Sequence, residues 1–305
     1  MNKFDLTHAR HDPAHCLAPG LFRSLKRGER KKLKLDVTYR FGDDVIRFWG
    51  PEPLGCDDLR VLQGLVAMSA VSGNRGRGIE LRYDPQSEAG QQLRKWLDLK
   101  WDAIEKVGLV AKGSFRQLAR ELGYAEDGGS QLKTIRDSIE RLWAVSMIIE
   151  RGSKREGFRI LSSYASDENA GKLFVAINPR LAEAVMGERP YTRIDMNEVR
   201  ALHTGPARLI HQRLCGWIDP GKKGRVELDT ICGYVWPDQG TAEAVKKRRQ
   251  IARRALDELA ALGWKLDEYV RCKWEIGRPQ LSMPRCLPDG ITFPKPRRNA
   301  PQVPA

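Results

Sequence analysis

The chain has 305 residues, of which 41% are hydrophobic and 30% are charged, a composition that is ordinary for a soluble globular protein of about two domains. Its formal net charge of +14 and its pI of about 9.6 favour a polyanionic partner, which at this level could be DNA, RNA or an anionic membrane surface. No apolar run approaches the roughly 20 residues that span a bilayer, and no signal-peptide core is found near the N-terminus, so we expect a cytoplasmic protein.

Residues 1–34 are expected to form a basic N-terminal arm. Lys31 and Lys32 belong to a dense cluster of lysines and arginines that begins at Arg23, and both are candidate DNA contacts. Because few residues in this stretch are suited to building a core, the arm is expected to order only in a complex.

Residues 35–178 are predicted to form the first of two winged-helix domains. Alternating and helical apolar spacings predict its first elements: the hairpin Leu35–Phe41 with Val45–Trp49, the helix Asp57–Ala70, the strand Ile79–Tyr83 and the helix Leu93–Val107. Ser114 is then expected to cap a short helix, Phe115–Leu122, and Ser130 to begin a second helix after a turn. This helix–turn–helix pattern indicates a DNA-binding unit.

A basic two-stranded ribbon is expected to follow as the wing of this unit. Its strands are predicted at Val145–Glu150 and Phe158–Tyr164, and Lys172–Ile177 is expected to extend the same small sheet. Three cations of the wing are candidate phosphate contacts: Arg151, Lys154 and Arg155. On the second helix, Lys133 and Arg136 stand among acidic residues, so contact with DNA and contact with protein both remain open.

The same order of elements recurs after a connector at 179–194, which predicts a second winged-helix domain over 195–278. Its elements are predicted as follows: helices Asp195–Leu202, Pro206–Ile218 and Leu228–Val235, a strand Arg225–Glu227, and wing strands Trp264–Glu268 and Lys273–Ile276. The Pro-rich residues 279–305 are expected to be a disordered tail. The chain is thus predicted to be an α+β protein with two tandem winged-helix domains.

The most basic helix of the chain is predicted at Thr241–Trp264, with Thr241 as its N-cap. The residues Ile251, Ala255, Leu259 and Leu262 recur at helical spacing and predict the face that packs on the core. Seven residues on the remaining surface are candidate DNA contacts: Lys246, Lys247, Arg248, Arg249, Gln250, Arg253 and Arg254. The alternative for such a charged face is a solvated surface helix.

Catalytic and metal-binding patterns are not convincing in this sequence. There is no nucleotide-binding P-loop and no combination of Ser, His and Asp that suggests a nucleophilic triad. Four residues near the N-terminus have spacings that could bind zinc, but no second ligand pair stands nearby: His8, His11, His15 and Cys16. His211 and Cys215 share a helix face, where core packing is the favoured interpretation. We therefore expect a binding protein that is not an enzyme and uses no metal or cofactor.

Several segments together resemble the family of IncQ-type plasmid replication initiators, RepC. They are His11–Tyr39, Gly50–Gly55, Asp57–Met68, Ile139–Ile148, Gly157–Glu168, Leu173–Pro179, His211–Lys222, Cys232–Pro237 and the KKRRQ motif at Lys246–Gln250. The resemblance spans residues 8 to 278 and implies two tandem winged helices that bind directly repeated double-stranded DNA sites, the iterons of a plasmid origin. It further implies that binding helps to open the origin and that a plasmid helicase and primase follow.

Two rival functions are compatible with parts of the sequence. A winged-helix transcriptional regulator would share the DNA-binding units without acting in replication. A nicking nuclease would need a nucleophilic Tyr or Ser near clustered histidines, and no Tyr lies near the histidines of the arm. Self-association through the first winged helix also remains possible, because its second helix carries charges of both signs.

Overall fold

The computed structural model describes residues 6–26, 28–70, 78–81, 108–124, 128–167 and 170–280. The helix predicted at Leu93–Val107 and nearly all of the tail predicted at 279–305 lie outside these residues. The described part is a mixture of helices and antiparallel strands, which confirms the predicted α+β class. No described helix has the length and apolar character that crossing a membrane requires.

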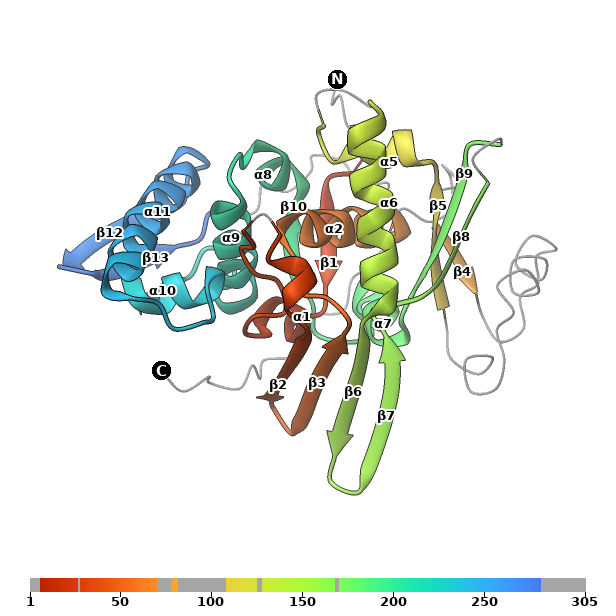
Figure 1. Cartoon of the computed structure of the whole chain (residues 1–305), viewed down its shortest axis with the longest axis horizontal. Coiled ribbons are helices and arrows are strands. Elements are labelled where there is room, and N and C mark those ends of the chain that lie inside the picture. Colours follow the sequence, from red (N-terminus) through yellow and green to blue (C-terminus); the bar gives the residue numbers. More distant parts are fainter. Residues whose placement is uncertain are drawn as a thin grey trace.

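Two four-stranded sheets and a central helix organise the first part of the chain (Figure 1). The first sheet has the order β2 (Leu35–Phe41), β3 (Asp44–Gly50), β6 (Ser146–Arg151), β7 (Lys154–Arg159). The second has the order β4 (Gly78–Leu81), β5 (Gly108–Gly113), β9 (Lys172–Ile177), β8 (Leu161–Asp167). Helix α2 (Cys56–Ala70) is buried along most of its length and contacts α6, α7, α9, β1 and β5. Its buried residues are mostly apolar, and the buried polar side chains Asp58 and Gln63 have hydrogen-bond partners on other elements.

The two helices predicted for the helix–turn–helix unit are present, although the second begins at Gly129, one residue before the predicted Ser130. Ser114 caps α5 (Phe115–Glu121) by accepting a hydrogen bond from the backbone N–H of Gln117 at 3.1 Å. Helix α6 (Gly129–Ala144) buries Ile135, Ile139 and Leu142.

The wing predicted for this unit is wrong in two respects. The β6–β7 hairpin turns between Arg151 and Lys154, so Lys154 and Arg155 lie in a strand and not in a long basic loop. The expected strand Phe158–Tyr164 is divided between two sheets, and β9 pairs with β5 and β8 instead of extending the sheet of β6 and β7. The division falls at Ile160 and Leu161, two consecutive buried residues that break the alternation of a single strand.

The expectation that residues 1–34 order only in a complex is wrong for the residues described. Strand β1 (His8–His11) pairs antiparallel with β10 (Thr192–Asp195), and α1 (Pro13–Leu17) packs against α9. Leu6, Ala9, Ala14, Leu21 and Phe22 are all buried. The segment contacts several different elements, including β10, α2, α7 and α9, and its buried apolar residues follow no helical or strand period that the sequence could reveal.

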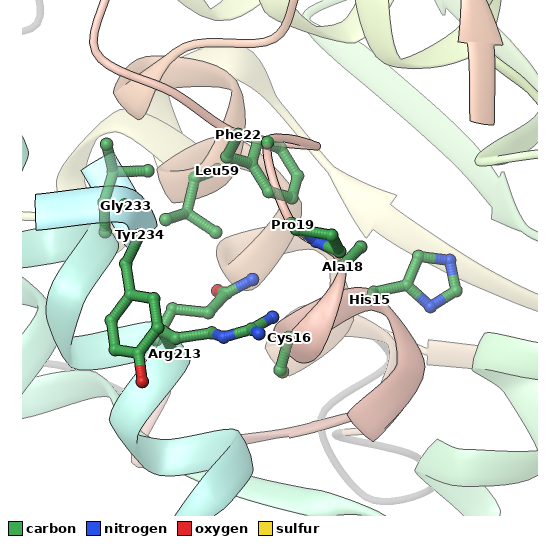
Figure 2. Close-up of a pocket in the computed structure, with 12 residues that line it drawn as sticks. His15, Cys16, Ala18, Pro19, Phe22, Leu59, Arg213, Gly233 and Tyr234 are labelled. Carbon is green, nitrogen blue, oxygen red and sulfur yellow. The ribbon is translucent and has the colours of Figure 1, made fainter. Parts of the chain in front are cut away.

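The N-terminal segment also joins the two halves of the molecule. The backbone N–H of Ser24 donates to the carbonyl of Val235 at 2.9 Å, and any side chain at Gly20 would meet Pro237 at 3.2 Å. A cavity of about 40 Å³, space for a water molecule or two, is left where α1, α2, α9 and α10 meet. Figure 2 shows Cys16 and Arg213 beside it.

The second part contains the remaining predicted elements. Helix α7 (Pro179–Met186) ends at Gly187, whose φ of 80° is a left-handed C-cap. Helices α8 (Met196–Ala201), α9 (Gly205–Trp217), α10 (Leu228–Val235) and α11 (Ala242–Ala261) follow. A three-stranded sheet has the order β11 (Lys223–Glu227), β13 (Lys273–Gly277), β12 (Lys265–Val270). This succession of two helices and a hairpin is the layout expected of the second unit.

Buried ion pairs tie the N-terminal segment to the first sheet. Arg180 of α7 donates from Nε to Asp12 and from Nη1 to Asp44 Oδ2 at 3.0 Å, and both carboxylates are 2% exposed. Asp44 also accepts from Arg151 at 2.6 Å. Burial by itself would raise the pKa of Asp44, but the hydrogen bonds from Arg151 and Arg180 outweigh it and hold that pKa below its ordinary value. Asp44 therefore stays charged at neutral pH, as its arginine partners require.

We expect Arg180→Ala to lower the free energy of unfolding by about 3–5 kcal/mol, because it leaves the buried carboxylate of Asp12 without its arginine and removes one of the two arginines bound to Asp44. Chemical denaturation of the full chain measures the loss. Arg189→Ala is the matched control: Arg189 pairs with Glu183 at a partly exposed site, and its loss should stay below about 1 kcal/mol. Equal losses in the two variants would contradict a structural role for the buried pairs.

Candidate nucleic-acid interface

Helix α11 has the start that its sequence predicts. The Thr241 hydroxyl accepts from the backbone N–H of Ala244 at 3.3 Å, and Glu243 lies in the first turn, where the helix dipole favours an anion. The buried face is Ala252, Ala255, Leu256 and Leu259. The predicted stripe is therefore correct at Ala255 and Leu259, whereas Ile251 and Leu262 are only half-buried.

Four of the predicted DNA contacts on α11 are exposed and unpaired. Lys246, Lys247, Gln250 and Arg254 make no ion pair or side-chain hydrogen bond with any described residue. Their spacing places them on one face of the helix, opposite the buried one. This face of α11 thus offers three cations and one amide to a partner, which is the residue content of a groove-reading helix.

The arginines between them are held by other parts of the protein. Arg249 forms two hydrogen bonds of 2.6 Å with the carboxylate of Asp229 on α10. Arg253 forms two of 2.7 Å with Glu268 on β12. Arg248 donates to the backbone carbonyl of Asp238 at 2.6 Å.

The two arginine–carboxylate pairs affect the charge of the arginines and of their carboxylate partners. The hydrogen bond from Arg249 lowers the pKa of Asp229, and the hydrogen bond from Arg253 lowers the pKa of Glu268 to about 2. Both carboxylates are charged at neutral pH, so Arg249 and Arg253 are neutralised locally and position α11 against α10 and β12. Asp229 and Glu268 were missed at the sequence level because nothing in their spacing marks them as partners of α11.

The candidate contacts of the first unit do not join the face of α11. Lys133 pairs with Asp137 at 3.2 Å, and the Arg136 guanidinium lies 5.5 Å from the centre of the Phe115 ring. Arg151 is bound to Asp44 and Arg155 to Glu150, whereas Lys154 is exposed. In Figure 1 the β6–β7 hairpin projects from the bottom of the molecule, and α11 lies at its left end. The two basic features therefore face different regions of space.

The basic cluster near the N-terminus is a third, separate feature. Lys31 and Lys32 lie in a short 3-10 helix (Arg30–Lys32) and are both exposed. Arg30 is not available in the same way, because it donates to the buried carboxylate of Asp58 at 2.9 Å.

One group of described residues brings three possible metal-ligand atoms within 4.8 Å of one another: Glu198, His211 and Cys215. The Nε2 of His211 lies 2.6 Å from Glu198 Oε2 and 3.4 Å from Cys215 Sγ. Ligand atoms at zinc distances of about 2.0–2.1 Å and tetrahedral angles stay roughly 3.3 Å apart. The shorter nitrogen–oxygen separation is that of a hydrogen-bonded ion pair, which joins α8 to α9 beneath α11.

Comparisons with known proteins give a family and two similar folds. The family model of replication protein C (RepC) matches residues 3–280. Domains 2 and 3 of RctB, in a selenomethionine crystal structure, superpose with a TM-score of 0.53 at 12% identity, covering 87% of this chain and 97% of that one. A second structure of RctB domains 2–3 gives 0.51 at 13% identity, with 87% and 95% covered. Both show that the fold is shared.

A third structure, the Pi initiator protein in complex with iteron DNA, covers 91% of this chain and 99% of its own at 13% identity, with a TM-score of 0.38. No curated protein matches the chain by sequence.

The ion pair beneath α11 predicts a loss of stability at alkaline pH. Burial lowers the pKa of His211, but Cys215 and Glu198 outweigh it and raise that pKa to about 10. Because the unfolded value is 6.5, this contribution is complete below pH 6.5 and is lost as the pH rises toward 10. Denaturation curves across this range should show a decline that His211→Gln abolishes. An identical decline in the variant would assign it to other groups.

Proposed function

This chain belongs to the replication protein C (RepC) family and is a replication initiator, and from that premise we propose that it binds directly repeated sites in double-stranded DNA at a plasmid origin through the exposed face of α11. The observation that carries the proposal is the set of unpaired side chains on that face: Lys246, Lys247, Gln250 and Arg254.

The exposed face of α11 carries side chains suited to base contacts and side chains suited to phosphate contacts. Gln250 has the donor and acceptor that pair with the N6 and N7 of adenine in the major groove. Lys246 stands one turn earlier and has the charge to contact guanine O6 and N7. Lys247 and Arg254 flank them and supply charge for phosphates. A helix reads bases from its N-terminal residues, so Lys246 and Gln250 lie where base edges are expected.

The basic β6–β7 hairpin and the N-terminal cations support further contacts to the DNA backbone. Lys154 at the hairpin and Lys31 and Lys32 near the N-terminus are exposed. The β6–β7 hairpin lies apart from α11 (Figure 1), so one protein molecule would contact phosphates along an extended site. An extended site bound in one orientation suits direct repeats, whereas a compact two-fold dimer suits a palindrome.

In this proposal the chain recognises DNA and catalyses no step. Adjacent repeats occupied together would help to open the origin, and the plasmid helicase and primase would then act on the exposed strands. Self-association between molecules on neighbouring repeats would raise occupancy.

Binding to a duplex carrying the origin's repeats should weaken steeply with salt. If about 6–10 phosphates are neutralised, affinity should fall on the order of 10³–10⁵-fold between 50 and 200 mM salt. Footprinting on the origin, with a duplex of scrambled repeats as control, measures this together with specificity. Equal protection of the scrambled duplex would overturn the proposal of a specific repeat-binding protein.

Two single variants separate base reading from phosphate contact. We expect Gln250→Ala to cost about 1–3 kcal/mol of binding free energy and to relax specificity at one base pair, because a bidentate contact is lost. Lys247→Ala should weaken binding evenly across sequences and reduce the salt slope by about one. Competition binding with every single base substitution of the repeat measures both. Uniform weakening by Gln250→Ala would exclude it from base reading.

A further inference from the structure

The tip of the β12–β13 hairpin carries two neighbouring apolar side chains in solvent. Tyr269 is 43% exposed and Val270 is 51% exposed, and they adjoin the two-residue turn of Arg271 and Cys272. Figure 1 places this hairpin beside α11, at the end of the molecule farthest from the two large sheets. Large apolar side chains exposed together on a projecting turn indicate a surface that is covered in a complex.

The turn behind these side chains is held in an unusual conformation. Cys272 has a φ of 64° and is the single non-glycine residue with a positive φ in the described part of the chain. A residue of this kind in the left-handed region is strained and keeps that conformation only where its surroundings hold it. Here Glu268 Oε1 accepts from the backbone N–H of Cys272 at 2.7 Å, which closes the turn. The shape of the tip is therefore fixed in the free protein.

The same carboxylate fixes the tip to α11. Arg253 donates hydrogen bonds to both carboxylate oxygens of Glu268, and its guanidinium also lies 5.6 Å from the centre of the Trp274 ring on β13. A bidentate arginine–carboxylate pair constrains both distance and orientation. The distance between the exposed face of α11 and the apolar tip is therefore fixed. Such a fixed distance is needed if both features contact the same rigid partner.

An arginine without an ion pair stands beside the apolar pair. Arg271 is exposed within the turn and makes no ion pair with any described residue. Lys273 pairs with Glu227 at 3.3 Å, and Arg225 pairs with Glu275 at 3.1 Å while its guanidinium lies 5.1 Å from the centre of the Tyr269 ring. An exposed arginine beside an apolar pair matches the minor groove, whose negative potential attracts arginine and whose base steps accept apolar wedges. An apolar protein partner would not require this cation.

We propose that Tyr269 and Val270 form a wedge that enters the minor groove next to the major groove read by α11 and partly unstacks one base step. This inference rests on the proposed function, since it needs α11 seated on the repeat. Arg271 would contact the flanking phosphates, and Arg253 would act as a positioning residue for the wedge. Each occupied repeat would then contribute one locally weakened step to the opening of the origin.

The wedge is tested with the full chain and with duplexes of the origin's repeat in which 2-aminopurine, a base whose fluorescence rises on unstacking, replaces one adenine at a time. Wild-type protein should raise the fluorescence at one step beside the α11 footprint. The double variant Tyr269→Ser/Val270→Ser should still bind but leave that fluorescence at the level of the free duplex. Tyr191→Ser, which removes an aromatic side chain of similar exposure far from the hairpin, is the matched control and should behave as wild type.

Each outcome bears on a different statement. A bound wild-type complex with no fluorescence change at any position, or a double variant that retains the change, would overturn the wedge while leaving repeat binding intact. Absence of repeat binding by the wild-type protein would overturn the proposed function itself.

The role of Arg253 has its own readout. Arg253→Ala should lose the 2-aminopurine signal but keep the protection of guanine N7 in the major groove against methylation, and Arg253→Lys should restore part of the signal. Loss of protection at a single guanine would instead make Arg253 a base contact and not a positioning residue.

Discussion

Arg180 lies between the carboxylates of Asp12 and Asp44, out of contact with solvent, and this arrangement constrains most of the first half of the molecule. A buried cation between two buried anions is tolerated only when every partner is in place. Asp12 also caps α1, and Asp44 also binds Arg151 at the base of the β6–β7 hairpin. The N-terminal segment, α7 and the first sheet must therefore assemble together. A second buried carboxylate, that of Asp58, likewise accepts hydrogen bonds from two arginines, Arg30 and Arg141 of α6.

The orientation of α11 depends on a comparable set of polar contacts near the surface. Glu258 accepts hydrogen bonds from the backbone N–H groups of His203 and Thr204, which fastens the C-terminal half of the helix to the start of α9. Asp229 and Glu268 hold its middle through Arg249 and Arg253. Each surface pair is weak alone, but together they fix the helix from three sides. A groove-reading helix that is oriented before binding loses less conformational entropy when it binds.

Local signals in the sequence located most helices of the second half of the fold, but they missed strand β10 and placed the end of α11 at Trp264 instead of Ala261. Helix α10 has the predicted bounds, Leu228–Val235, and Thr241 caps α11, because capping and helical periodicity act within one element. The N-terminal segment was mispredicted because its contacts come from β10, α2 and α9, distant partners that leave no periodic trace. Charge alone likewise identified α11 as basic but did not separate the exposed Lys246 and Gln250 from Arg249 and Arg253. That distinction depends on carboxylates brought in from α10 and β12 by the tertiary fold.

The pairing of β1 with β10 has a consequence for the order in which the chain folds. His8 lies opposite Asp195, and the backbone N–H of Ser24 donates to the carbonyl of Val235, so these residues gain their final partners only after the chain has been synthesised past Asp195 and Val235. Contacts between residues far apart in the sequence form slowly, because closing the long loop between them costs conformational entropy before the contact contributes any stabilising free energy. The apolar residues of the N-terminal segment therefore remain uncovered during translation, and a nascent or truncated chain that stops before β10 exposes them to aggregation.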